Sequence, residues 1–231
     1  MGLVKENPML RDRVGVFSGR ADAGKKLAME MKGFVERDSL LLAIPAGGVP
    51  VAVEIAEELD LALDVIVVRK IQIPDEPEAG FGAVGPDDEV VLNQELLQSL
   101  GLSQREVDAQ ITATIEGRAR RERLFRGEVP FPSLQGKSVI LVDDGLATGG
   151  TMLVAARFVK KKAAKKIAVA VPTASLRAID LLKSEVDNIF CPNVRSGRYF
   201  AVADAYLDWY DLTEAEAIDI LRSHRKLPAN P

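Results

Sequence analysis

Apolar positions along the chain form short continuous runs that alternate with stretches of helical spacing. The runs are rich in Leu, Ile and Val and predict buried strands at 39–45, 63–68, 137–142, 167–171 and 186–191. Apolar residues three to four positions apart predict helices at 22–35, 51–59, 151–162 and 176–184. Because strands and helices alternate, we expect an α/β fold with a mostly parallel central sheet flanked by helices.

Three segments depart from this alternation. Residues 71–88 are rich in Pro, Gly and acidic residues and carry no steady period, which predicts a long functional loop. An inserted helical segment follows at about 93–127. The C-terminal tail, 193–231, is rich in aromatic residues and belongs to no obvious strand–helix unit. We therefore expect one domain over 1–231 with its core at about 20–192.

Composition narrows the functional classes. Of 231 residues, 47% are hydrophobic and 28% charged, which provides for a buried core and argues against global disorder. The net charge of −4 gives no support to nucleic-acid binding. No apolar run is long enough to span a bilayer, and the N-terminus lacks the apolar stretch of a signal peptide. We therefore expect no membrane partner and a cytoplasmic location.

The single cysteine and the single histidine argue against several kinds of structural and catalytic site. Cys191 is the sole cysteine, so no intramolecular disulfide can form, which fits a reducing compartment. Its place at the end of an apolar run predicts a buried strand residue. His224 is the sole histidine, which argues against Ser-His-Asp or Cys-His catalysis and against His-rich metal sites.

The strongest chemical signal is VILVDDGLATGGTM, residues 139–152. Asp143 and Asp144 stand where an apolar strand ends, and ligands of open parallel sheets bind beyond the carboxyl ends of strands. The paired carboxylates are suited to accept hydrogen bonds from the hydroxyls of a ribose. The turn and the start of the next helix predict a phosphate cradle of N–H groups and hydroxyls, from Gly145, Thr148, Gly149, Gly150 and Thr151.

Two other interpretations of this segment are weaker. A Walker A loop requires Lys after the last glycine, where Thr151 stands. A plain strand–turn–helix junction would need neither two adjacent acids nor two threonines. The joint pattern therefore favours the phosphate cradle.

At these residues the chain resembles the phosphoribosyl diphosphate signature of type I phosphoribosyltransferases. VDDGLATGGTM is particularly similar to the version in adenine phosphoribosyltransferases, and IPAGGVPVAVEIA, VVRK, EAGFGAV and VVLN match, in order, a group with unassigned bases. The resemblance implies the type I fold with a small hood and a mobile loop. It also implies Mg²⁺ as cofactor, phosphoribosyl diphosphate and a small nitrogenous base as substrates, and a homo-oligomer, a dimer.

The resemblance assigns roles to further residues. The loop after the first strand would hold pyrophosphate through its backbone amides, at Ala46, Gly47 and Gly48. Many relatives carry Arg before the two glycines, so Ala46 removes a cation. Arg69 and Lys70 end the second strand. One of these two is the expected catalytic contact to the pyrophosphate, at the start of the mobile loop.

The paired acids and their neighbours bear on the metal and the base. By the resemblance, Asp143 and Asp144 hold Mg²⁺, in part through water. Enzymes for 6-oxopurines usually carry Asp at the third position after the pair, where this chain has Ala147. A purine N7 would lack that carboxylate, which weighs against hypoxanthine and guanine and favours adenine or another amino-substituted heterocycle.

Two classes of function stay open. The first is a transferase in which a ring nitrogen of the base displaces pyrophosphate from C1 of the sugar. The second is a regulator or sensor that binds phosphoribosyl diphosphate without efficient turnover. Lys70, the paired acids and the mobile loop favour the transferase, whereas Ala46 favours the sensor.

Three other features carry weaker signals. GFGAVG at 80–85 matches a dinucleotide-binding pattern but precedes Pro86 rather than a helix, so that interpretation fails. Glu76 and Glu78 in the same loop are expected to be solvated. An Arg-rich stretch at 118–126 predicts a solvated helix face or a dimer contact. The aromatic residues of the tail could stack on a base or form a small satellite core.

Overall fold

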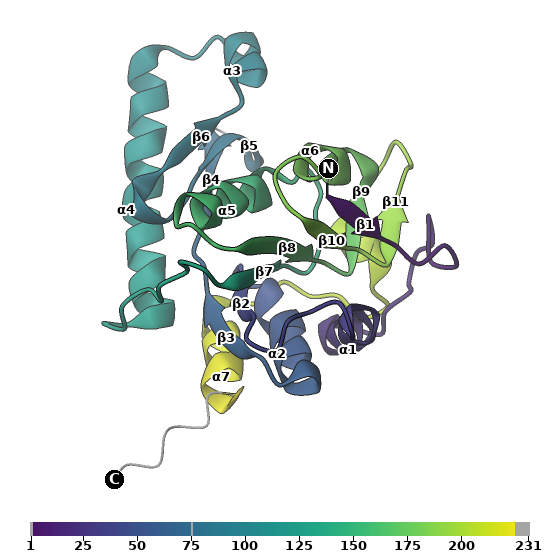
Figure 1. The fold of residues 1–231 in the computed structure, drawn as a ribbon. Coiled ribbons are helices and arrows are strands. Elements are labelled where there is room, and N and C mark those ends of the chain that lie inside the picture. Colours follow the sequence, from purple (N-terminus) through teal and green to yellow (C-terminus); the bar gives the residue numbers. More distant parts are fainter. Residues whose placement is uncertain (1, 75, 225–231) are drawn as a thin grey trace.

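The computed structural model describes residues 2–74 and 76–224, apart from the side chains of Pro77 and Glu78. Its centre is a six-stranded sheet in which every pairing is parallel, in the order β1-β10-β8-β7-β2-β3 (Figure 1). The strands are β1 (Leu3–Lys5), β2 (Leu40–Ala43), β3 (Ala62–Val65), β7 (Ser138–Val142), β8 (Lys166–Ala170) and β10 (Asn188–Phe190). The expected α/β class with a mostly parallel sheet is confirmed. The sheet begins before the expected core boundary near residue 20, because β1 pairs with β10.

Helices cover both faces of this sheet (Figure 1). On one face lie α1 (Arg20–Met31), α2 (Gly48–Leu59) and α7 (Glu214–His224), and on the other α5 (Gly150–Lys161) and α6 (Leu176–Leu182). Along β2, Leu41 and Ala43 pack with α1 and α2, whereas Leu40 and Leu42 pack with α5 and α6. Because both faces are apolar, the strands have no polar alternation and appear in the sequence as continuous hydrophobic runs.

The tail holds more regular structure than its sequence indicated. Strand β11 (Asn193–Arg195) pairs with β9 (Thr173–Ser175), and a short 3-10 helix, η2 (Val202–Ala205), precedes α7. Ala217 and Leu221, four residues apart, are buried where α7 packs against α2. Such a short apolar face carries little periodic signal, which explains why α7 was not expected.

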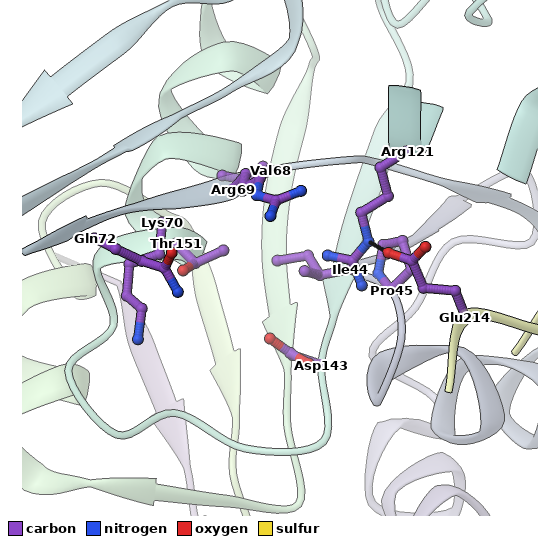
Figure 2. A pocket seen from close by; sticks show the side chains of 10 residues that line it. All are labelled: Ile44, Pro45, Val68, Arg69, Lys70, Gln72, Arg121, Asp143, Thr151 and Glu214. Atoms are coloured by element: carbon purple, nitrogen blue, oxygen red, sulfur yellow. Dashed lines mark ion pairs between the residues drawn. The ribbon is translucent and has the colours of Figure 1, made fainter. Parts of the chain in front are cut away.

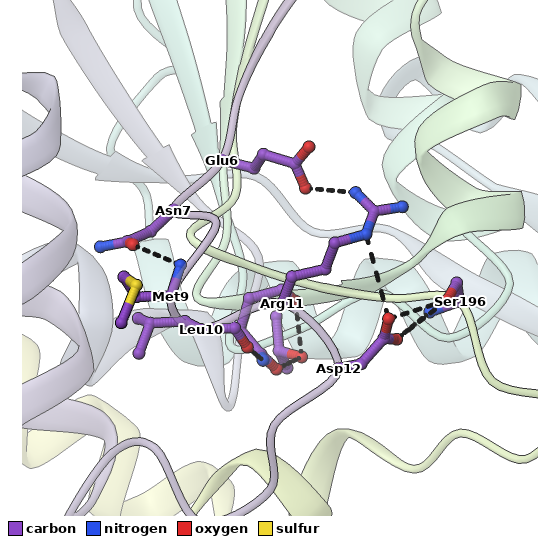
Figure 3. A network of polar contacts seen from close by, with 9 residues as sticks. Glu6, Asn7, Met9, Leu10, Arg11, Asp12 and Ser196 are labelled. Atoms are coloured by element: carbon purple, nitrogen blue, oxygen red, sulfur yellow. Dashed lines mark hydrogen bonds and ion pairs between the residues drawn. The ribbon is translucent and has the colours of Figure 1, made fainter.

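The N-terminal segment forms hydrogen bonds with the beginning of the tail (Figure 3). Asp12 accepts a hydrogen bond of 2.6 Å from the backbone N–H of Ser196. Arg11 forms a 2.6 Å ion pair with Glu6 that steadies this turn. The side-chain amide of Asn193 donates to the carbonyl of Leu10 at 2.5 Å. The first residues of the tail are therefore tied to the turn around Asp12 by polar contacts.

The segment 71–88 is largely strand, so the prediction of a long loop was wrong. An antiparallel sheet forms from β4 (Arg69–Ile73), β5 (Glu76–Val84) and β6 (Val90–Leu92), with a 3-10 turn, η1 (Pro86–Asp88), between the last two. Ile71, Phe81 and Val84 are fully buried in its core. A Cβ on Gly80 would lie 2.3 Å from Cγ of Lys70, so glycine is needed where the strands meet closely. The glycines obscured the strand pattern in the sequence.

The inserted helical segment consists of α3 (Gln94–Leu100) and α4 (Gln104–Arg126). A capping box between Ser103 and Glu106 fixes where α4 begins. Val107 and its partly buried neighbours on α3 and α4 pack against the antiparallel sheet, and α4 runs past the edge of the main sheet (Figure 1). Within the described part of the chain, no helix has the length and apolar character to cross a membrane.

Candidate functional site

The loops after β2 and β7 meet at the carboxyl edge of the main sheet. These strands are parallel neighbours, with Ala43 in register with Val142. A Cβ on Gly47 would lie 2.0 Å from a carboxylate oxygen of Asp144, and one on Gly48 would lie 2.6 Å from the carbonyl of Val142. Both glycines are therefore required by the close approach of the two loops. The Pro45–Ala46 peptide bond in the first loop is cis.

Asp144 is held by an arginine that the sequence did not single out. Nε of Arg20, the first residue of α1, donates to Asp144 Oδ2 at 2.8 Å, and the two side chains are 8% and 15% exposed. The guanidinium of Arg20 stacks over Trp209, 4.0 Å from the ring centre. The hydroxyl of Tyr206 donates to the backbone carbonyl of Asp144 at 2.5 Å. The paired acids are thus connected to both α1 and the tail.

Burial perturbs the protonation of both acids. Burial raises the pKa of Asp143 well above its usual range, and the nearby charge of Asp144 raises it further. Burial also raises the pKa of Asp144, which the cation of Arg20 opposes. A hydrogen-bond donor or a cation placed against Asp143 would stabilise its charged form. The pair is therefore suited to receive ligand hydroxyls or a metal.

The turn that follows the paired acids is held by the neighbouring β9 strand. Leu146 forms a parallel bridge with Ala174, and the hydroxyl of Ser175 donates to the carbonyl of Ala147 at 2.6 Å. Gly149 has φ of 77°, in the left-handed region that favours glycine. No side chain caps the N-terminus of α5, so its first N–H groups can bind an anion.

A cavity of about 450 Å³ lies beside these loops (Figure 2). It brings together four of the residues singled out from the sequence: Arg69, Lys70, Asp143 and Thr151. The remaining lining residues were not expected from the sequence: Ile44, Pro45, Val68, Gln72, Arg121 and Glu214. The other expected site residues are not in its lining and lie in the loops after β2 and β7 or at the first positions of α2 and α5: Ala46, Gly47, Gly48, Asp144, Gly145, Ala147, Thr148, Gly149 and Gly150.

The Arg-rich stretch of α4 is not a uniformly solvated face, which corrects the expectation. Arg118 and Arg126 are buried, and Arg126 forms a 2.5 Å ion pair with Asp64. Arg121 lines the cavity with its side chain 20% exposed. Arg120, in contrast, is 66% exposed, as expected of a solvated residue. Helical spacing turns only some of these arginines toward the body of the protein. Composition alone therefore could not distinguish the buried arginines from the solvated ones.

The aromatic residues of the tail divide between two environments. Tyr206 packs with Phe17 and Trp209 in a satellite core, with ring centres 5.7 Å and 5.1 Å apart. Tyr199 is 86% exposed. The satellite-core alternative therefore describes Tyr206 and Trp209. GFGAVG at 80–85 lies in and after β5 and is followed by the 3-10 turn η1 rather than by an α-helix, as its context indicated. The side chain of Glu78 lies outside the described residues, and Glu76 is exposed, as expected.

The side chains at the cavity suit a metal cation that takes most of its coordinating atoms from a bound substrate and from water. Among residues 2–74 and 76–224, no group of three or more His, Cys, Asp or Glu could hold a metal ion by itself. Mg²⁺ commonly uses one or two carboxylates together with water and substrate phosphates. Asp143 in the cavity, with Asp144 beside it, is a donor set of that kind.

Comparisons with known proteins agree with this geometry. A family model described as phosphoribosyl transferase domain matches residues 21–207. Two Mycobacterium tuberculosis proteins, from strains CDC 1551 and H37Rv, carry the provisional name phosphoribosyl transferase and are each 35% identical over 91% of this chain. The chain spans about half of their length, 47%. The crystal structure of TT1426 from Thermus thermophilus is 33% identical, with a TM-score of 0.72 over 90% of this chain and 98% of that one.

Proposed function

The chain belongs to the phosphoribosyl transferase domain family, and on this premise we propose that it transfers the 5-phosphoribosyl group from phosphoribosyl diphosphate to a nitrogenous base. In this reaction the bond between C1 and the diphosphate oxygen breaks, a bond from C1 to a ring nitrogen forms, and pyrophosphate leaves. The observation that carries the proposal is the meeting of Arg69, Lys70, Asp143 and Thr151 around one cavity.

Each of these groups supports a separate part of the substrate. The uncapped N-terminus of α5 with Thr151 suits the 5′-phosphate. Asp143, charged once a donor approaches it, suits the ribose hydroxyls. The cations of Arg69 and Lys70 suit the departing diphosphate, whose charge grows in the transition state.

Mg²⁺ would be held by Asp143 and Asp144, in part through water, and would neutralise charge on the diphosphate. Residues of the β4–β5 hairpin, including Lys70 and Gln72, line the cavity, so a movement of this hairpin could cover a bound substrate and exclude water. A single domain, a dimeric assembly and a cytoplasmic location remain part of the proposal, and light scattering tests the assembly.

A pyrophosphate-release assay tests the activity. The protein is mixed with Mg²⁺, phosphoribosyl diphosphate and one of adenine, hypoxanthine, guanine, xanthine, uracil, orotate or a simple amino-heterocycle. Because Ala147 carries no carboxylate, the 6-oxopurines should be poorer acceptors than adenine. Lys70→Ala should abolish turnover while retaining much of the substrate binding, since its charge matters most as the diphosphate departs. Lys137→Ala, at an exposed position outside the cavity, is the matched control.

The second candidate function is a sensor of phosphoribosyl diphosphate. Ala46 favours it, because this position contributes no cation to the diphosphate loop. Tight binding of phosphoribosyl diphosphate without pyrophosphate release from any base would replace the transferase proposal by the sensor. A best activity with guanine would contradict the use of Ala147.

A further inference from the structure

Arg121 occupies an unusual position for a residue of an Arg-rich helix. It lies on the inserted helix α4, far in sequence from both loops of the site, yet its side chain lines the cavity. Figure 2 shows its guanidinium extending down from α4 toward Pro45, above Asp143. Arg69 extends its guanidinium into the same space from β4. The two cations therefore face one cavity from different elements.

The contacts of Arg121 are incomplete. Its Nε lies 2.6 Å from a carboxylate oxygen of Glu214, at the first turn of α7. Beyond this ion pair, the buried Nε–H has no acceptor in hydrogen-bonding geometry among the described residues. Burial lowers the pKa of Arg121, and the charge of Arg69 lowers it further, against the opposing effect of Glu214. Arg69 is exposed and Arg121 is partly buried, and an added anion between these two mutually repelling cations would stabilise both.

Local packing explains how Arg69 and Arg121 come together. A Cβ on Gly117, one helical turn before Arg121, would lie 2.8 Å from Nη1 of Arg69. The glycine therefore lets Arg69 pass close along α4 toward the cavity. A larger side chain at this position would require the guanidinium of Arg69 to shift.

We propose that Arg121 binds the diphosphate of the sugar substrate and that Glu214 holds Arg121 until the diphosphate replaces it. A planar guanidinium matches two phosphate oxygens, and this contact would offset the cation that Ala46 lacks. The inference rests on the proposed function, since it assigns the diphosphate to the same cavity. On binding, Arg121 would exchange the carboxylate of Glu214 for the more highly charged diphosphate. The ion pair that joins α4 to α7 would therefore break as the substrate enters.

The test is calorimetric titration of the full chain, with Mg²⁺, against phosphoribosyl diphosphate, inorganic pyrophosphate and ribose 5-phosphate. Arg121→Gln should weaken binding of the first two ligands roughly 10- to 100-fold, the effect of one lost charge-assisted contact. Binding of ribose 5-phosphate should stay unchanged, because that ligand has no diphosphate. Arg120→Gln is the matched control, since it changes the same charge on a neighbouring residue that is 66% exposed.

A second variant separates a binding role from a structural one. Glu214→Gln removes the competing carboxylate and should strengthen pyrophosphate binding, whereas loss of a merely structural pair would weaken it or leave it unchanged. Circular dichroism and thermal unfolding of each variant check that the fold is retained. Arg121→Lys should restore only part of the affinity, because an ammonium lacks the bidentate geometry.

The outcomes distinguish this inference from the proposed function. If the wild-type protein binds neither sugar phosphate, the proposed function is wrong. If the wild type binds phosphoribosyl diphosphate and folded Arg121→Gln binds it equally well, the role of Arg121 is overturned while the proposed function stands. If Glu214→Gln weakens binding as Arg121→Gln does, Glu214 positions Arg121 and does not compete with the ligand.

Discussion

Replacing Arg20 by Gln should destabilise the protein in a way that depends on pH. The substitution removes the partner of Asp144, whose side chain is 15% exposed, and also the cation over Trp209. Breaking a buried ion pair by removing one partner costs about 3–5 kcal/mol, because the remaining charge is left without compensation. The residual exposure of Asp144 places the expected loss near the lower end, about 3 kcal/mol.

The sign of the pH dependence follows from the pKa of Asp144. Burial raises this pKa, and Arg20 opposes the increase. Without Arg20, the folded-state pKa of Asp144 rises further above its unfolded value. Between these two values the folded state binds more protons than the unfolded state, so the free energy of unfolding falls as pH rises through that window. The loss caused by Arg20→Gln should therefore be greatest near neutral pH and smaller at about pH 4.

Urea unfolding of the wild type and the variant at several pH values measures this effect. Lys25→Gln on the same helix is the control, because Lys25 is 57% exposed and its pair with Glu54 at 3.5 Å should contribute at most about 1 kcal/mol. Asp144→Asn added to Arg20→Gln should recover most of the stability by removing the uncompensated charge. A loss below about 1 kcal/mol that is equal at all pH values would refute the reasoning.

Three further predictions follow from the packing and the charges. Asp143→Asn should raise the free energy of unfolding at neutral pH, because it removes a carboxyl whose pKa is raised by burial and whose ionised form the folded state disfavours, and it should weaken binding of phosphoribosyl diphosphate. Urea unfolding and calorimetry measure the two effects, and equal binding would contradict the ribose contact. Gly47→Ala should lower ligand affinity, since its Cβ would lie 2.0 Å from Asp144 and push the two loops apart; an unchanged affinity in the same titration would argue against this close approach. Phe81→Ala should lower the free energy of unfolding in urea by about 3–5 kcal/mol, because its fully buried ring fills the core between the β4–β5 hairpin and α4. A decrease below about 1 kcal/mol would mean that this small core does not unfold cooperatively with the core of the main sheet.

The main architecture could be predicted from the sequence because its elements are locally encoded. Short strands built almost entirely of apolar residues are buried on both sides, which predicts a parallel sheet covered by helices. The strand–DDGLATGG–helix segment likewise places acids, glycines and threonines at the end of a strand, so its chemistry is contained in fifteen or so consecutive residues. Burial of Cys191 followed from the same apolar pattern.

Other features depended on contacts between distant segments. The sequence predicts a loop where the β4–β5 hairpin lies, because Gly80 and Gly82 interrupt its apolar pattern. Only the pairing of β5 with both neighbours explains why glycine stands there. The helix α7 has a short apolar face whose burial depends on α2.

The sequence by itself determined the parallel sheet, and it singled out the paired acids and the cations Arg69 and Lys70. These two cations begin β4 rather than end the second strand, because β3 stops at Val65. Only the tertiary structure decided that Arg20 pairs with Asp144, and that Arg121 rather than Arg120 turns into the cavity to meet Glu214. The physical reason is the range of the interactions. Hydrogen-bonded turns and apolar periods act between residues close in the chain, whereas an ion pair between α1 and the loop after β7, or between α4 and α7, depends on how whole elements pack.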